Sequence, residues 1–253
     1  MKTIKIAIFA LMASTLLLTT SCKKEEPTTN GNGQVTINLK HLWGMGTDTF
    51  RLNTTYIHPM NGDTMTFSTY KYYVSNFKLK KSDGTWWVHP ESYFLVDLSS
   101  NSSSLLDLGA LPIGEYTELS YTLGVDSLRN VSGAQTGALS TANNMFWSWN
   151  SGYIMIKAEG ISPQSSTGNF AFHLGGFSGV NSTVATKTVD FSSNPLTIKK
   201  DKISEIHFNV NTAMTWCTSG SCAGTSSVMM PGAIGHQMAT DFHNGFVFDY
   251  IVE

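Results

Sequence analysis

Histidine, methionine and cysteine are the residues of this chain whose types could do chemistry. The sequence contains 7 His and 11 Met but only 3 Cys. Imidazole nitrogen suits copper and zinc, and the methionine thioether suits copper(I). The sequence has no HExxH, GxSxG, P-loop or helix-opening GxGxxG motif, and its acidic residues are few and scattered. These features favour metal binding over catalysis, so we expect a protein that is not an enzyme.

His41 is the histidine with the most informative position. In the segment "QVTINLKHL" it shares one face with Val35, Ile37 and Leu39, because the pattern alternates with a period of two. This apolar face is expected to turn inward. Burying an imidazole without a partner costs about 1–3 kcal/mol. We therefore expect His41 to have a hydrogen-bond partner or a metal.

Three other histidines lie in or beside predicted strands. His173, in "FAFHLGG", lies on the face opposite its apolar neighbours, close to a strand end marked by two glycines. His89 lies at another strand end, just before Pro90. His207 also alternates with apolar residues, and we expect it to face solvent. Strand ends at the rim of a sandwich, where loops meet, are places at which a metal can be held.

A late loop carries a second group of soft ligands. His236 and His243 lie there beside Met229, Met230 and Met238. Imidazole and thioether together suit copper(I). This loop is a possible second metal site, made by His236, His243 and Met238.

The segment "FWSWNSGYIMIKAEG" places Trp147 and Trp149 one residue apart, just before a predicted strand. Two such rings could cap the open end of a sandwich, because each buries about 150–250 Å². They could also lie beside a binding site. The two roles are compatible, and packing is the role that the local sequence favours.

The bulk composition restricts the function. The net charge is −2 and only 13% of the residues are charged, so no basic surface is available for nucleic acid. Residues 1–21 have a positive start and a short apolar run that ends in "TTSC", which resembles a bacterial lipoprotein signal cleaved before Cys22. Lipid on Cys22 would anchor the protein to a membrane. Residues 22–33 are predicted to form a flexible tether.

The charge run "KKEE" after Cys22 resembles the export tag of Bacteroidetes surface lipoproteins. We therefore expect an outer-membrane lipoprotein at the cell surface or on the periplasmic face. In such an oxidising compartment the two remaining cysteines, Cys217 and Cys222, are expected to form a small disulfide-closed loop. A metal pair is the alternative.

The folded part is predicted to be all-β. Residues 34–253 contain about ten short alternating segments, separated by Gly, Ser, Asn and Asp turns, and no amphipathic helix longer than a turn or two. This pattern predicts one antiparallel β-sandwich. Residues 125–149 and 211–243 form long loops, which commonly carry function.

Three segments resemble the MbnP-like family, the copper-binding proteins associated with methanobactin operons. They are "YIHPMNGDTMTFSTYKYYVSNFKL", "ALSTANNMFWSWNSGYIMIKAEG" and "FAFHLGG". Many relatives also carry a Leu-Asn-His block, whereas this chain reads Leu128-Arg129-Asn130-Val131. The chain is similar to a Bacteroidetes-type lipoprotein member of this family.

The resemblance implies a β-sandwich that binds one copper ion through histidine. Carried over residue by residue, His173 matches the family's His-Leu-Gly, and His41 occupies a first-strand position where relatives often carry histidine. With His89 these residues form the expected metal site. The resemblance also implies a partner, a diheme cytochrome c peroxidase-like protein that can oxidise a tryptophan to kynurenine. Three tryptophans are the candidates for this modification or for a packing role: Trp43, Trp147 and Trp149.

The alternative is a surface module that binds glycans or proteins without metal. β-Sandwiches with exposed aromatic residues can stack sugar rings. The candidates for this platform are Trp43, Trp86 and Trp87.

Overall fold

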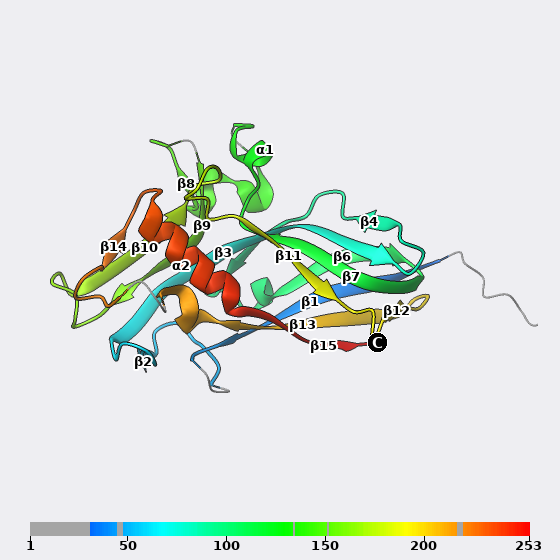
Figure 1. Ribbon diagram of the computed structural model, residues 1–253, viewed down its shortest axis with the longest axis horizontal. Coiled ribbons are helices and arrows are strands. Elements are labelled where there is room, and N and C mark those ends of the chain that lie inside the picture. The colour runs from blue at the N-terminus through cyan, green and yellow to red at the C-terminus, as the bar shows by residue number, and fades with distance from the viewer. Residues whose placement is uncertain (1–30, 45–47, 134, 151, 217–219) are drawn as a thin grey trace, which may run out of the picture.

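The chain folds into two β-sheets with a helix packed beside them (Figure 1). The computed structural model describes residues 31–44, 48–133, 135–150, 152–216 and 220–253. The predicted signal peptide, residues 1–21, and Cys22 lie outside the described residues. Within the described ranges, no helix is both long and apolar enough to cross a membrane.

The smaller sheet has four strands. In spatial order they are β15 (Phe246–Val252), β13 (Ile203–Asn211), β1 (Asn32–Leu42) and β6 (Leu105–Pro112). The inward face of β1 carries Val35, Ile37 and Leu39, all at most 3% exposed, as the alternation predicts. Its neighbour β13 runs parallel to it, and a long connection that includes most strands of the larger sheet separates the two in the sequence.

The larger sheet has eleven strands, six of which form its main order. Its main strands, in spatial order, are β11 (Ala185–Asp190), β7 (Gly114–Leu123), β3 (Thr64–Lys81), β9 (Gly152–Ile161), β10 (Asn169–Gly175) and β14 (Ser227–Val228). Five short strands pair along them, namely β2 (Thr55–Ile57), β4 (Trp86–Val88), β5 (Tyr93–Asp97), β8 (Phe146–Trp147) and β12 (Leu196–Ile198). The predicted all-β sandwich is confirmed. Most pairs are antiparallel, but the pairs β1–β13 and β10–β14 are parallel, so the sheets are mixed.

Aromatic rings fill the space between the layers. Tyr121 of β7 lies 5.4 Å, ring centre to ring centre, from Phe208 of β13. At the other half of the larger sheet, Tyr72 of β3 packs against Phe242 at 5.0 Å. The core therefore continues past the edge of the smaller sheet and is closed there by the helix that carries Phe242.

That helix, α2 (Ala233–Asn244), corrects the prediction that residues 211–243 form an irregular loop. Its buried residues Gly235, Met238, Ala239 and Phe242 follow the helical spacing i, i+3, i+4, i+7. The glycine and the small alanine weaken the apolar pattern in the sequence. The other helical segments are short: α1 (Ser127–Asn130), η1 (Asn101–Ser104), η2 (Gly137–Leu139), η3 (Thr141–Asn143) and η4 (Thr212–Trp216).

The first strand begins earlier than predicted. β1 starts at Asn32, so the last two residues of the predicted tether belong to the sheet, where they pair with β6. A side chain at Gly33 would collide with the carbonyl oxygen of Lys199. Glycine is needed at this position because another backbone approaches it closely.

Candidate functional site

The two sequence motifs around Trp147 and His173 meet in the structure. Trp147 lies at the end of β8, and its ring rests on Gly175 at the end of β10: a Cβ atom added at Gly175 would be 2.5 Å from Cζ3 of Trp147. Residues two apart on a strand face the same side. Trp147 therefore packs on the face of β10 that also carries His173.

His173 is held by a carboxylate on this face. Its Nε2 lies 2.6 Å from Oε1 of Glu159 on β9, and Nζ of Lys157 lies 3.4 Å from the same oxygen. Burial lowers the pKa of His173, against the opposing effect of the hydrogen bond to Glu159. Burial alone would raise the pKa of Glu159, but His173 and Lys157 lower it overall. The site thus pairs an imidazole whose neutral form is favoured with an ionised carboxylate.

Asn130 fixes the segment that leads to this site, and the sequence analysis did not single it out. Its side-chain Nδ2 donates to the carbonyl oxygens of Val125 at 2.6 Å and Asp126 at 2.9 Å. Its Oδ1 accepts from the backbone N–H of Tyr153 at 2.9 Å. The side chain therefore ties α1 to the start of β9, and only its place in the Leu128–Val131 block could have drawn attention to it.

Trp149 is the exposed member of the tryptophan pair. Its side chain is 62% exposed, whereas Trp147 is 5% exposed, and the two ring centres are 5.4 Å apart. Trp147 has the predicted packing role. Trp149 presents an indole to solvent in contact with the buried ring.

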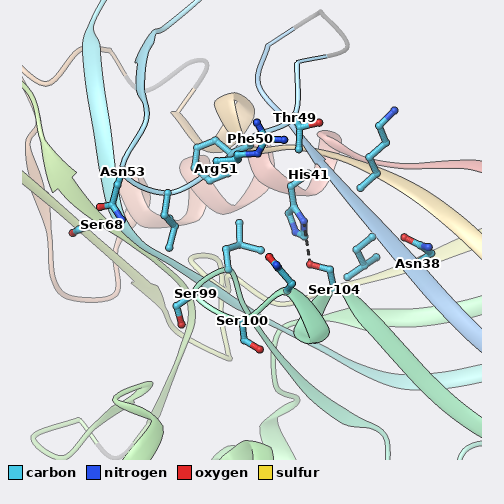
Figure 2. Close-up of a pocket in the computed structure, with 15 residues that line it drawn as sticks. Asn38, His41, Thr49, Phe50, Arg51, Asn53, Ser68, Ser99, Ser100 and Ser104 are labelled. Atoms are coloured by element: carbon cyan, nitrogen blue, oxygen red, sulfur yellow. Dashed lines mark hydrogen bonds between the residues drawn. The ribbon is translucent and has the colours of Figure 1, made fainter.

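His41 faces inward and has a hydrogen-bond partner, as predicted. It is 6% exposed, and its Nε2 lies 2.8 Å from Oη of Tyr72 on the facing sheet. Its Nδ1 lies 3.5 Å from Oγ of Ser104 at the edge of a cavity of about 840 Å³ (Figure 2). Burial lowers the pKa of His41 to about 4, so the ring is neutral at physiological pH.

The three predicted metal ligands are not brought together. His41 faces the interior from the smaller sheet, while His173 alternates with the core residues Phe172 and Leu174 and so faces away from the interior on the larger sheet. The larger sheet lies between the two imidazoles. Among the described residues, no group of three or more His, Cys, Asp or Glu side chains could hold a metal ion.

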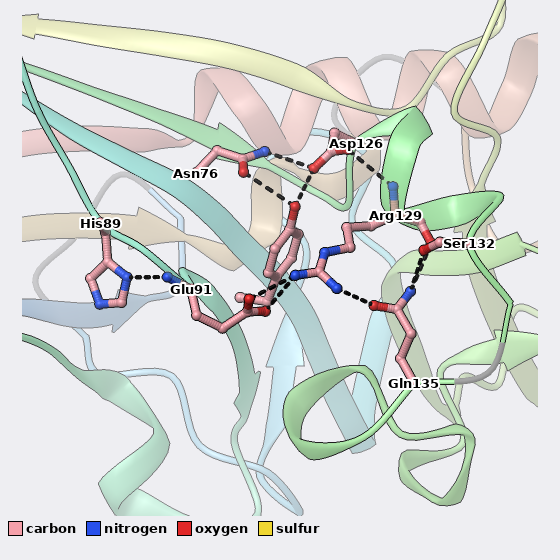
Figure 3. Close-up of polar contacts among 8 residues, drawn as sticks. Asn76, His89, Glu91, Asp126, Arg129, Ser132 and Gln135 are labelled. Atoms are coloured by element: carbon pink, nitrogen blue, oxygen red, sulfur yellow. Dashed lines mark hydrogen bonds and ion pairs between the residues drawn. The ribbon is translucent and has the colours of Figure 1, made fainter.

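His89 belongs to a separate polar network (Figure 3). Its Nδ1 accepts from the backbone N–H of Glu91 at 3.1 Å, and the carboxylate of Glu91 accepts from Arg129 at 2.7 and 2.9 Å. Arg129 also donates to Gln135 at 3.0 Å and lies over the ring of Tyr93. This network ties the loop after β4 to α1.

The predicted second metal site is also dispersed. Nδ1 of His236 donates to the carbonyl oxygen of Ser182 at 2.6 Å, and Met238 is buried in the core at 1% exposure. Burial, together with the positive charge of Lys187 and the nearby His236, lowers the pKa of His243 to about 3. A positive charge beside His243 opposes the binding of a cation there.

The predicted disulfide includes Cys217, which lies outside the described residues. The other cysteine, Cys222, is buried. Burial raises the pKa of this thiol to about 11, and the backbone N–H of Cys222 donates to Asp63 at 2.6 Å. Cys222 thus behaves as a small apolar residue in the core.

The aromatic platform of the glycan alternative is incomplete. Trp43 is 8% exposed, and its Nε1 donates to the carbonyl oxygen of Ile57 at 3.0 Å. Trp86 is 41% exposed, but Nζ of Lys80 lies over its ring. His207, expected to face solvent, is half-buried under the ring of Tyr250, whose centre is 4.3 Å away.

Comparisons with known proteins identify the family. The MbnP family model matches residues 32–230. A structure search finds MbnP from Methylosinus trichosporium, with a TM-score of 0.53 and 13% sequence identity, covering 81% of this chain and 84% of that chain. A comparison with curated protein sequences finds no match. The chain therefore belongs to the MbnP family, which is associated with copper-related function.

Proposed function

We propose that the protein is a copper-binding lipoprotein of the cell envelope, not an enzyme, and that His173 is its main copper ligand. The observation that carries this proposal is the meeting of the two family motifs, in which the ring of Trp147 rests on Gly175, two residues after His173. Family membership supports a copper-related role. We call the face of β10 that carries His173 and contacts Trp147 the motif face. It is the part of the molecule where the family motifs and the possible metal ligands lie together.

The residues on this face fit a copper site of low coordination number. Nε2 of His173 and Oε1 of Glu159 are 2.6 Å apart, so one ion could replace their shared proton and take both as ligands once the two side chains move apart to admit it. Lys157, 3.4 Å from the same oxygen, neutralises part of the carboxylate charge and limits the affinity for a cation. This donor set replaces the three imidazoles expected from the sequence.

We propose that the diheme peroxidase-like partner acts on the Trp147 and Trp149 pair. Trp149 is exposed, and the centre of its ring is 5.4 Å from that of Trp147. The two rings thus extend from the solvent to the face of β10 that carries His173. Trp43 is buried in a cluster with Phe50 and Tyr56 and lacks such exposure.

The placement of the pair suits a partner that approaches from the side away from the membrane. β1 begins at the end of the molecule that also holds β12 and the C-terminus, whereas β8 and β10 lie towards the opposite half (Figure 1). A lipid on Cys22 would hold the first of these ends near the membrane, at the cell surface or on the periplasmic face. The motif face would then remain accessible.

Metal analysis of the mature domain tests the copper proposal. The protein is produced in copper-replete cells with the diheme partner, and copper per chain is measured together with intact mass. We expect about one equivalent of copper in the wild type, and a loss of at least about tenfold in affinity in His173→Ala. His207→Ala is the matched control, because it removes another strand histidine that has a carboxylate neighbour, Glu205 at 2.8 Å. A wild-type protein without copper, or equal loss in both variants, would contradict the proposal.

A further inference from the structure

An open groove lies where β1 changes its neighbour. β6 pairs with β1 as far as Asn38, and beyond this point the backbone N–H of Phe50 donates to the carbonyl oxygen of His41 at 2.9 Å. Leu39 and Lys40 lie between these two pairings. The gap forms a groove of about 840 Å³, bordered by β1, residues 49–53 and residues 98–104 (Figure 2). Its volume is in the range of ligand-binding pockets.

The charges that line this groove are all positive. Lys40 and Arg51 are its charged lining residues, and no Asp or Glu lines it. Within the part of the chain that the structure describes, no ion pair or hydrogen bond engages either side-chain head group. The acidic residue just before the lining segment 98–101, Asp97, is neutralised by Lys71 at 2.8 Å. The groove thus offers two free cations in a protein whose net charge is −2.

The remaining lining is rich in amide and hydroxyl groups. Asn38, Asn53 and Asn101 line the groove, and their side chains have no hydrogen bond to another described residue. Each amide can donate and accept hydrogen bonds. Phe50 and Leu98 add apolar surface to the same wall. A ligand with hydroxyl groups, apolar C–H faces and a negative charge would satisfy all of these groups together.

We infer that this groove binds a carboxylate-bearing carbohydrate, such as a short chain of uronic acids. Arg51 would take the carboxylate as a two-pronged hydrogen-bonded pair, and Lys40 would add a second positive charge. The three asparagines would pair with ring hydroxyls. His41 lines the groove on the inner side of the larger sheet, whereas His173 faces the outer side of that sheet. Carbohydrate binding in the groove is therefore independent of copper binding at His173.

An extended acidic peptide suits the groove less well. Peptides that add to a sheet need a run of free backbone groups along a strand edge. Here the open edge of β1 is limited to Leu39 and Lys40, because β6 and residues 48–50 occupy the positions on either side. Two residues are too few for strand addition.

Titration calorimetry on metal-free protein tests this inference. The probes are trigalacturonate, the neutral sugar maltotriose and hexaglutamate, and the side-chain resonances of His41 report whether the ligand enters the groove. We expect trigalacturonate to bind at least tenfold more tightly than maltotriose and hexaglutamate and to shift the His41 resonances. Arg51→Gln should weaken binding at least tenfold.

Lys202→Gln provides the matched control, because it removes one exposed positive charge outside the groove. Its affinity should stay within twofold of the wild type, and thermal melting should show that both variants are folded. No binding of trigalacturonate, equal binding of maltotriose or hexaglutamate, or equal affinity of the wild type and Arg51→Gln would overturn the inference. Copper content plays no part in this readout, so its failure would leave the copper proposal standing.

Discussion

The indole ring of Trp147 occupies the space in which a side chain at position 175 would lie. A Cβ atom at Gly175 would be 2.5 Å from Cζ3 and 2.8 Å from Cη2 of this ring. The glycine of His-Leu-Gly and the first tryptophan of Trp-x-Trp are thus two halves of one contact. This contact places the buried indole on the face of β10 that carries His173.

Gly175→Ala should therefore destabilise the protein. The added methyl group must displace Trp147, because the carbonyl oxygen of Tyr153 lies 2.9 Å from the same position and the backbone cannot retreat. Overpacking of this kind costs about 1–3 kcal/mol in the free energy of unfolding, which urea denaturation measures. Gly235→Ala in α2 is the control: its nearest neighbour would be 3.5 Å away, and we expect a change within about 1 kcal/mol. Equal effects would refute the close contact.

Asn130→Ala should cost more than most substitutions in this chain. The side chain is 2% exposed and makes three hydrogen bonds, to Val125, Asp126 and Tyr153. Its removal leaves the carbonyl oxygen of Val125 and the N–H group of Tyr153 to find new partners, while the carbonyl oxygen of Asp126 keeps the backbone N–H of residue 130. We expect a cost of about 3 kcal/mol in the free energy of unfolding. Ser132→Ala, at an exposed position two residues later, should change it by less than about 0.5 kcal/mol. An Asn130→Ala variant as stable as Ser132→Ala would show that the network is not needed.

The protein should become less stable as the pH is lowered, because His41 titrates. Burial lowers the pKa of His41 from 6.5 to about 4 in the folded protein, so between these values the unfolded chain binds more protons. The contribution is complete above pH 6.5 and is lost as the pH falls towards 4. By linkage, the wild type should lose about 2 kcal/mol more than His41→Gln between pH 7 and pH 4.5. Urea denaturation at both pH values measures this difference, and equal losses would contradict the burial of a neutral imidazole.

Oxidation by the proposed diheme partner should fall on the Trp147 and Trp149 pair. Co-expression followed by peptide mass mapping should find the kynurenine mass change in the peptide that holds this pair, because Trp149 is 62% exposed and its ring contacts Trp147. The peptide containing Trp43, which is 8% exposed, serves as the internal control and should stay unmodified. Modification of Trp43 alone would move the site to the aromatic cluster around Phe50.

Alternation in the sequence was sufficient to predict the strands and the inward side of β1, because a period of two assigns a face to each residue. It could not assign each strand to a sheet. His41 and His173 therefore looked like ligands of one site, although the larger sheet separates them. The helix α2 was missed because Gly235 and Ala239 lie among its buried residues and dilute the apolar stripe. The contact of Trp147 with Gly175 depends on tertiary packing, which no local pattern reports.

We propose that copper binds on the face of β10 that carries His173 and not at His41. Copper per chain in His173→Ala and His41→Ala, each produced with the partner and compared with the wild type, tests it most directly. We predict that His173→Ala loses copper while His41→Ala keeps it, because the larger sheet separates the two imidazoles and Nε2 of His41 is bonded to Tyr72 at 2.8 Å. Loss of copper in folded His41→Ala, with retention in His173→Ala, would contradict the account.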